Sequence, residues 1–207
     1  GRYIGDRNSE IVTSVLVSAS ALLSIYVLYQ VVVNQYEENI VIATWINSGS
    51  LDVNWSMLID PLSAVMLVVV TSVSSLVHIY SIGYMSHDPH KPRFMAYLSL
   101  FTCAMLMLVT ADNVLQLFFG WEGVGLCSYL LIGFWYKKES ANNAAIKAFV
   151  VNRIGDFGLA IGIFLIFFYF GTINFQEIFE ITPQFIEKKL VFFGFETSLI
   201  TLICIFL

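Results

Sequence analysis

Long apolar runs separated by short polar stretches make up most of this chain, which predicts a bundle of membrane-spanning helices. A helix that crosses a bilayer needs roughly 20 predominantly apolar residues, within a range of about 17 to 25. Five runs are long enough, and a sixth begins at Leu190 and stops at Leu207. We therefore expect an all-α polytopic membrane protein with one membrane domain over residues 1–207. The expected spans are residues 11–33, 57–84, 94–110, 114–136 and 141–170, with 190–207 as an incomplete sixth.

The segment 34–56, between the first two spans, is polar and contains no Lys or Arg. Leu51, Val53 and Trp55 alternate with polar residues, a period that is typical of a half-buried strand. The NSGS sequence at 47–50 favours a turn. The segment is therefore either a small β-hairpin on the outer membrane surface or a plain loop.

Several polar residues precede apolar runs and are candidates for helix caps. Asp60 stands directly before Pro61, which is the arrangement of an N-cap followed by Pro at the first helical position. Asp112 or Asn113 is in position to cap the fourth span. Residues 174–181 read as a short amphipathic helix.

Composition supports the membrane assignment and excludes other classes. Hydrophobic residues make up 58% of the chain and charged residues only 12%, whereas soluble domains carry roughly 25% charged residues. The net charge is −5 and no basic stripe is interleaved with aromatic residues, so nucleic acid is not an expected partner. Cys103, Cys127 and Cys204 stand singly in apolar runs, without metal-site or disulfide spacing, and are expected to be small buried hydrophobic residues.

Lys and Arg are concentrated in alternate loops. The N-terminal flank and the loops 85–93 and 137–140 carry them, while 34–56 and the turn at 111–113 carry none. The segment before Leu190 is acidic until Lys188 and Lys189, so the alternation holds at five of six places. By the positive-inside rule, the three basic segments face the cytoplasm or matrix.

Glu122 lies well inside the fourth apolar run, in the sequence GWEGVG. A charged side chain near the centre of a bilayer costs about 3 kcal/mol even on the lower scales, so such a residue is a candidate functional site. The surrounding glycines allow close helix approach or room for water. The alternative is a structural Glu held by hydrogen bonds.

The fifth run carries three further charges: Lys147, Arg153 and Asp156. Arg153 and Asp156 are three residues apart, a spacing that permits a salt bridge within the helix. Counted from the inner end by helical rise, Arg153 and Asp156 lie at depths of roughly 18 and 22 Å, and Glu122 at about 21 Å. We therefore expect one polar layer containing all three, whereas Lys147 is either part of a relay or a lysine that snorkels to the interface.

His78, near the inner end of the second span, is a further relay candidate because its unperturbed pKa of about 6.5 suits proton transfer. A hydrogen-bonded structural histidine is the alternative. By helical rise it lies roughly 27 Å from Asp60, so the two cannot share a site on this helix.

Three stretches resemble a known family closely: ADNVLQLFFGWEGVGLCSYLLIGFWY at 111–136, AAIKAFVVNRIGDFGL at 144–159 and GTINFQEI at 171–178. They look like the antiporter-like subunit 5 of proton-pumping NADH:ubiquinone oxidoreductase, respiratory complex I. The resemblance implies an antiporter-like helix bundle in which the essential glutamate falls on Glu122 and the arginine–aspartate pair on Arg153 and Asp156. The family's partner lysine lies on the helix that begins at Leu190, so we expect this chain to be part of a longer protein, truncated or split.

The resemblance also implies the chain's setting. No cofactor is expected on this chain, because NADH, FMN, the iron–sulfur clusters and ubiquinone bind other subunits. The implied partners are other complex I subunits, especially a neighbouring antiporter-like subunit, the remaining C-terminal part of the protein or a second polypeptide that carries it, and membrane lipids. The implied location is the mitochondrial inner membrane, with a bacterial plasma membrane as the alternative. A multi-subunit sodium/proton antiporter and a non-transporting structural subunit are the competing functions.

Overall fold

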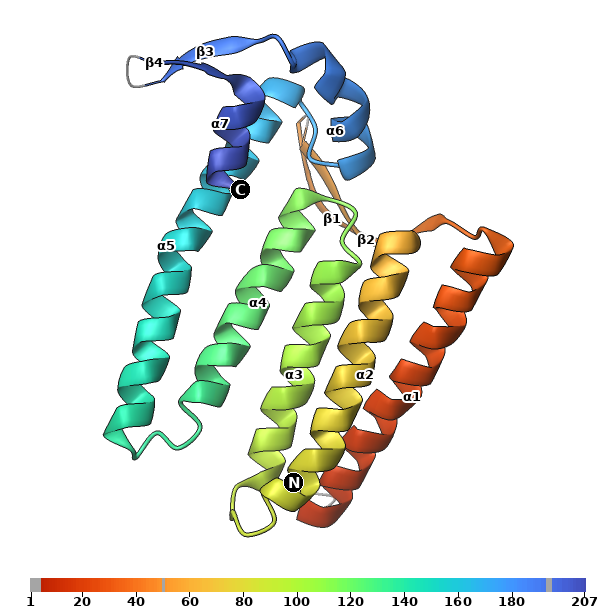
Figure 1. The fold of residues 1–207 in the computed structure, drawn as a ribbon, viewed down its shortest axis with the longest axis vertical. Helices are drawn as coiled ribbons and strands as arrows, with labels where there is room; N and C mark the ends of the chain where they lie inside the picture. Colours follow the sequence, from red (N-terminus) through yellow and green to blue (C-terminus); the bar gives the residue numbers. More distant parts are fainter. Residues whose placement is uncertain (1–4, 50, 193–194) are drawn as a thin grey trace.

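Five long helices lie side by side and form the body of the molecule (Figure 1). The computed structural model describes residues 5–49, 51–192 and 195–207. Within these residues, five helices are long and apolar enough to cross a membrane. The membrane fold expected from the apolar runs is confirmed. These helices are α1 (Asp6–Asn34), α2 (Pro61–Tyr84), α3 (Lys91–Val109), α4 (Val114–Ile132) and α5 (Glu139–Phe170).

The basic segments lie together at one end of the bundle, which we call the inner end (Figure 1). The start of α1, the α2–α3 loop and the α4–α5 loop all lie there. The opposite, outer end carries the segment between α1 and α2, the α3–α4 turn and the elements that follow α5. This arrangement agrees with the distribution of Lys and Arg among the loops, except for Lys188 and Lys189, which lie at the start of β3 at the outer end.

Helix starts at the outer end follow the expected caps. The Asp60 carboxylate accepts a hydrogen bond from the Ser63 amide, and the Ser63 hydroxyl accepts one from the Asp60 amide, which completes a capping box before α2. Asn113 rather than Asp112 caps α4, since its side chain accepts a hydrogen bond from the Gln116 amide. The left-handed Gly171 (φ 75°) ends α5.

The helix ends differ from the expected spans by a few residues. The second span begins at Pro61 rather than Met57, because residues up to Ile59 belong to a strand. The third begins at Lys91, with Pro92 in its first turn, so the basic loop is shorter than expected. The fourth ends at Ile132, since the following residues, from Gly133 on, form turns. The apolar runs in the sequence therefore extend a few residues beyond the ends of the second and fourth helices.

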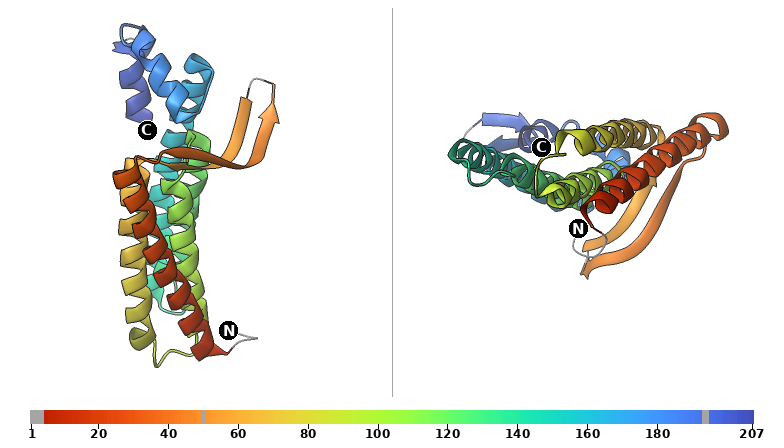
Figure 2. Two further views of the ribbon diagram at one scale, coloured as in Figure 1. Left: turned by 90° about the vertical axis from the view of Figure 1, so that its right-hand side faces the viewer. Right: turned by 90° about the horizontal axis from the view of Figure 1, so that it is seen from below.

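The segment after α1 forms a β-hairpin, which decides between the two readings of residues 34–56. Strand β1 (Glu38–Ser48) pairs antiparallel with β2 (Leu51–Ile59), and two register shifts interrupt the ladder. Figure 2 shows the hairpin reaching sideways at the outer end of the bundle. Trp45 and Trp55 make edge contacts with each other and with Phe119 of α4, at centroid distances of 5.1 to 5.6 Å. These aromatic contacts attach the hairpin to the helices.

A buried polar cluster joins the hairpin to the α3–α4 turn. Gln116, only 1% exposed, accepts a hydrogen bond from the Ser56 amide (3.0 Å) and donates one to the Ser56 carbonyl (2.7 Å). Asp112, also buried, accepts hydrogen bonds from the side chains of Asn39, Asn113 and Asn174. The cluster therefore connects β1, β2, the α3–α4 turn and the segment after α5.

Replacing Gln116 tests this connection. In Gln116→Leu, the Ser56 amide and carbonyl lose their partner inside the protein, and each unsatisfied buried group costs about 1 to 3 kcal/mol. We expect a clear fall in the thermal midpoint of the detergent-solubilised protein. Gln176→Leu is the matched control, because Gln176 is exposed on helix α6 (Phe175–Ile181). Equal midpoints for the two variants would show that Gln116 does not hold the hairpin.

The expected sixth span starting at Leu190 is wrong in its first part. Strands β3 (Lys189–Phe192) and β4 (Phe195–Ser198) pair antiparallel, and helix α7 begins only at Leu199 and ends at Phe206. A short apolar run cannot be assigned to strand or helix by periodicity alone. The Ser198 hydroxyl, which accepts a hydrogen bond from the Thr201 amide, marks the true helix start.

The short helix predicted at 174–181 is present as α6, and residues 182–185 continue it as a turn of 3₁₀ helix. Asn174 caps α6 through the Gln176 amide. Ile178 packs in the main apolar cluster at the outer end, where α4, α5, α6 and α7 meet. Its buried members are Val114, Ile163, Ile166, Ile178, Leu199 and Ile203.

Small polar side chains, rather than large apolar ones, connect the first three helices. Hydroxyl pairs link Ser18 to Ser75 (2.7 Å), Ser24 to Thr71 (2.7 Å), and Ser74 to Thr102 (2.6 Å). Such residues permit close approach and hydrogen bonding between membrane helices, where lipid removes the hydrophobic driving force for helix association.

The expectation for the cysteines holds in part. All three are free thiols, and Cys127 is buried, but Cys103 and Cys204 are exposed on the surface of this chain. Both lie on helix faces that the other described residues leave exposed. In a membrane helix an apolar face need not be covered by protein, so an apolar neighbourhood in sequence does not imply burial.

Candidate functional site

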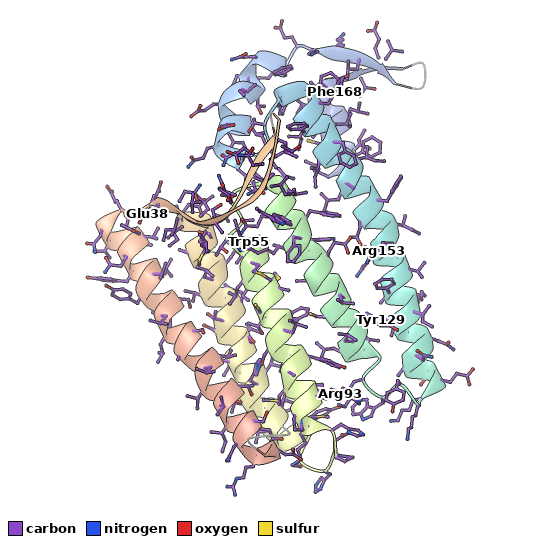
Figure 3. All side chains as sticks on the ribbon, turned by 180° about the vertical axis from the view of Figure 1, so that it is seen from behind. Glu38, Trp55, Arg93, Tyr129, Arg153 and Phe168 are labelled. Carbon is purple, nitrogen blue, oxygen red and sulfur yellow. The ribbon has the colours of Figure 1, made fainter. Side chains whose placement is uncertain are left out.

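Glu122 of α4 and Arg153 of α5 form a direct ion pair across the two helices. The Arg153 Nη1 group donates to both carboxylate oxygens of Glu122, at 2.5 Å each. Figure 3 shows Arg153 roughly halfway along α5. The two helices thus bring the charges to one level, away from both ends of the bundle.

Asp156 is the second partner of Arg153. Its carboxylate lies 3.7 Å from Arg153 Nη1, which is the salt bridge expected from their spacing within α5. Its other oxygen accepts a hydrogen bond from the indole N–H of Trp121 (2.9 Å), which precedes Glu122 on α4. Arg153 also lies over the ring of Phe149, 4.8 Å from its centroid. One cation is therefore shared by two carboxylates and an aromatic face.

Glycines on α4 allow its close approach to α3. A Cβ atom at Gly120 would lie 2.7 Å from the backbone of Leu108, and one at Gly123 would lie 3.1 Å from Ala104. Close packing on this side turns the neighbouring Trp121 and Glu122 towards α5, where Asp156 and Arg153 lie. The glycines of the GWEG sequence thus pack against α3, while its Trp and Glu side chains bind residues of α5.

Burial of these charges is uneven within this chain. The side chain of Asp156 is 7% exposed, that of Glu122 is 25% exposed and that of Arg153 is 50% exposed. A hollow of about 360 Å³ lies beside Arg153 and is otherwise lined by apolar residues of α5. Among the described residues, Glu122 is therefore only partly buried, and no described helix covers the open side of Arg153.

The other two candidate residues lie apart from this ion pair. His78 is fully buried between α2 and α3, where Nδ1 donates to the Ser74 carbonyl (2.8 Å) and Nε2 lies 3.1 Å from the Ser99 hydroxyl. Lys147 is exposed on α5, and no carboxylate of the described residues lies within salt-bridge distance of it. It precedes Arg153 by about 9 Å along the helix. A relay role for either residue stays a prediction.

Two residues of the site were not identified from the sequence. Trp121 holds Asp156, and Phe149 supports Arg153. The spacing could have indicated Phe149, because it lies one helical turn before Arg153 and therefore on the same face of α5. Nothing in the sequence indicated that Trp121 crosses to Asp156, because that contact depends on how α4 and α5 are rotated against each other.

The arrangement places one fixed positive charge between two carboxylates, each of which can take up a proton. Arg153 keeps its positive charge at any physiological pH, whereas a carboxylate loses its charge when it takes up a proton. Protonation of Glu122 would remove its attraction to Arg153 and leave Asp156 as the remaining anionic partner. Among the described residues, no three His, Cys, Asp or Glu side chains gather as a metal site.

Comparison with known proteins agrees with the sequence motifs. Residues 45–95 match the family described as NADH-ubiquinone oxidoreductase (complex I) chain 5 N-terminus, and residues 111–207 match the NADH:quinone oxidoreductase/Mrp antiporter transmembrane family. Chain 5 of NADH-ubiquinone oxidoreductase from Chondrus crispus is 51% identical over 207 residues, which is all of this chain and 31% of that protein. Subunit L of NADH-quinone oxidoreductase from Rickettsia bellii is 48% identical over 206 residues, 32% of its length.

Solved structures show the same fold. A chain of the Mrp complex from Dietzia sp. has a TM-score of 0.70 at 25% identity, over 80% of this chain and 18% of that one. A chain of an archaeal membrane-bound sulfane sulfur reductase has a TM-score of 0.73 at 18% identity, over 84% of this chain and 35% of that one. The present chain spans about a third of the length of the relatives it matches by sequence. It belongs to the family of NADH-ubiquinone oxidoreductase chain 5.

Proposed function

We propose that this chain is part of a membrane-arm subunit of respiratory complex I and contributes to proton translocation. In this proposal NADH oxidation and ubiquinone reduction take place in other subunits, which also hold FMN and the iron–sulfur clusters. The chain performs no redox step itself. Its family membership and its helix bundle support the assignment to the membrane arm.

The observation that carries the proposal is the sharing of Arg153 between Glu122 and Asp156. Glu122 is the protonatable group, and Arg153 is the charge that responds to its state. When Glu122 takes up a proton, Arg153 interacts with Asp156 alone; when Glu122 releases the proton, the pair with Arg153 forms again. A two-state charge arrangement of this kind couples proton uptake to a change elsewhere in the protein.

The proposed surroundings follow from the relatives. Other complex I subunits, including a neighbouring antiporter-like subunit, are the proposed protein partners, and the exposed apolar faces of the helices contact them or lipid. The proposed location is the mitochondrial inner membrane, because the relatives from Chondrus crispus and Triticum aestivum are named NADH-ubiquinone oxidoreductase chain 5. The Rickettsia relative keeps a bacterial plasma membrane as the alternative.

A multi-subunit sodium/proton antiporter is the second candidate. The match of residues 111–207 to a family shared with Mrp antiporters favours it, as does the likeness to the Mrp complex structure. The two candidates use the same helix bundle but differ in their partners. An antiporter of this kind works without an NADH-oxidising arm.

Native gel electrophoresis of solubilised membranes, stained for NADH oxidation and followed by peptide mass spectrometry, separates the two candidates. We expect peptides of this chain in a large band that oxidises NADH. Peptides confined to a smaller band without NADH oxidation would contradict the complex I assignment and favour the antiporter. Sealed vesicles supply an independent check, since NADH-driven acidification without a sodium requirement is expected only for complex I.

A further inference from the structure

 

A cavity lies at the inner end of the bundle, where α3, α4 and α5 meet. Its volume is about 180 Å³. Arg93, at the start of α3, is the charged residue among those that line it, and Figure 3 labels it together with Tyr129 of α4. The remaining polar lining residues are Tyr97, Tyr129, Tyr136 and Asn142. The cavity therefore combines one cation with several uncharged hydrogen-bonding groups.

The Arg93 guanidinium has few partners within the described residues. A guanidinium carries five N–H donors, yet Arg93 makes one hydrogen bond, from Nη2 to the Phe134 carbonyl at 3.3 Å. Its Nε atom is buried and has no acceptor among the residues that the structure describes. The rings of Phe134 and Tyr136 lie 4.8 and 5.6 Å from its central carbon and hold the group in place. The two rings thus hold the Arg93 guanidinium in place and partly shield it from solvent, while several of its N–H donors have no acceptor among the described residues.

Positive charge gathers in the first turn of α3, where Arg93 lines the cavity. Lys91 and Arg93 occupy the first helical turn, which contains no acidic residue, and the side chain of the N-cap His90 makes no capping bond. Cations at the positive end of a helix dipole are unfavourable, whereas an anion there is stabilised. Lys91 lies 4.0 Å from Glu10, so that carboxylate is directed to Lys91 rather than to Arg93.

Asp88 is the acidic residue nearest to Arg93 in sequence, but both of its carboxylate oxygens already accept hydrogen bonds from other groups. Its two oxygens accept hydrogen bonds from the Trp135 indole and the His90 amide. These bonds, with smaller contributions from the charges of His90 and Arg93, hold the pKa of Asp88 below its usual value. Asp88 therefore stays anionic, but it does not supply the missing acceptor for Arg93 Nε.

We propose that this cavity binds the phosphate group of an anionic phospholipid through Arg93. Basic pockets between membrane helices on the cytoplasmic or matrix side take such headgroups, and the inner end is the basic end of this chain. A phosphate accepts several hydrogen bonds from one guanidinium, which matches the unused donors of Arg93. The tyrosine hydroxyls and the Asn142 amide supply further donors, and tyrosine is enriched at membrane interfaces. The inference does not depend on the proposed role of Glu122.

Photo-crosslinking in the intact solubilised complex tests the proposal. The probes are photoactivatable phosphatidylglycerol and its phosphatidylcholine analogue, and peptide mass spectrometry locates the label. We expect the anionic probe to label peptides 91–97 and 129–142 about fivefold more than the choline probe, since one basic residue near an anionic headgroup contributes about 1 kcal/mol. Arg93→Gln should abolish this preference, and Arg93→Lys should retain part of it.

Two further variants separate the site from general surface charge. Lys137→Gln removes one exposed positive charge from the α4–α5 loop without altering the cavity lining, and we expect the labelling preference to persist. Asn142→Glu adds a carboxylate at the cavity and should lower labelling even if Arg93→Gln fails to assemble. Equal labelling of the wild type and both cavity variants would overturn the proposal. Competition by millimolar inorganic phosphate would overturn the lipid assignment in favour of a free anion.

Discussion

Glu122→Gln is expected to lower NADH-driven proton transport strongly while leaving most of the complex assembled. The substitution keeps the size of the side chain but removes both its charge and its proton site. Coupling free energies between sites are typically about 1 to 3 kcal/mol, so we expect transport per assembled complex to fall about fivefold or more. The measurement is the initial rate of acidification of sealed vesicles, divided by the amount of assembled complex on a native gel.

Assembly should change little because Gln has nearly the same size as Glu and carries no charge that needs a partner inside the membrane. Arg153 also keeps its contacts with Asp156 and Phe149 in the variant. A loss of transport that merely follows a loss of assembled complex would therefore indicate a structural Glu122.

Glu180→Gln is the matched control for this experiment. Glu180 is exposed on α6, and no ion pair links it to another described residue. The same change of charge there should leave the transport rate intact. An unchanged ratio of protons to electrons in assembled Glu122→Gln would refute the proposed role.

Gly120→Ala is expected to disrupt the packing of α3 against α4. The added Cβ atom would lie 2.7 Å from both Cα and N of Leu108, so the helices must move apart. Overpacking of this kind costs about 1 to 3 kcal/mol and occasionally more, which exceeds the gain of about 1 kcal/mol from replacing Gly in a helix. We expect a lower thermal midpoint of the solubilised protein and less assembled complex.

Gly83→Ala provides the control on a second helical glycine. Gly83 lies near the inner end of α2, and a Cβ atom there has no neighbour within 4 Å. This variant should be as stable as the wild type or slightly more so. Equal losses for Gly83→Ala and Gly120→Ala would show that the close approach at Leu108 is not the cause.

Structural features that depend on local sequence patterns were predicted well. Apolar length predicted the five long helices, Asp60 and Asn113 were among the expected caps, and alternation favoured a hairpin as one of two readings. The start of the sixth span was wrong, since an apolar run of a few residues fits a strand as well as a helix. Spacing within α5 also predicted the salt bridge between Arg153 and Asp156.

By itself, the sequence determined the membrane class, the alternation of basic loops, the residue types available for proton chemistry and the family resemblance. Only the tertiary structure decided that Arg153 is shared with Glu122, that Trp121 holds Asp156 and that His78 belongs to a different pair of helices. The physical reason is that periodicity defines which residues share a face of one helix, but not how two helices are rotated against each other. That rotation depends on close contacts such as the one between Gly120 and Leu108, which form only when the chain has folded.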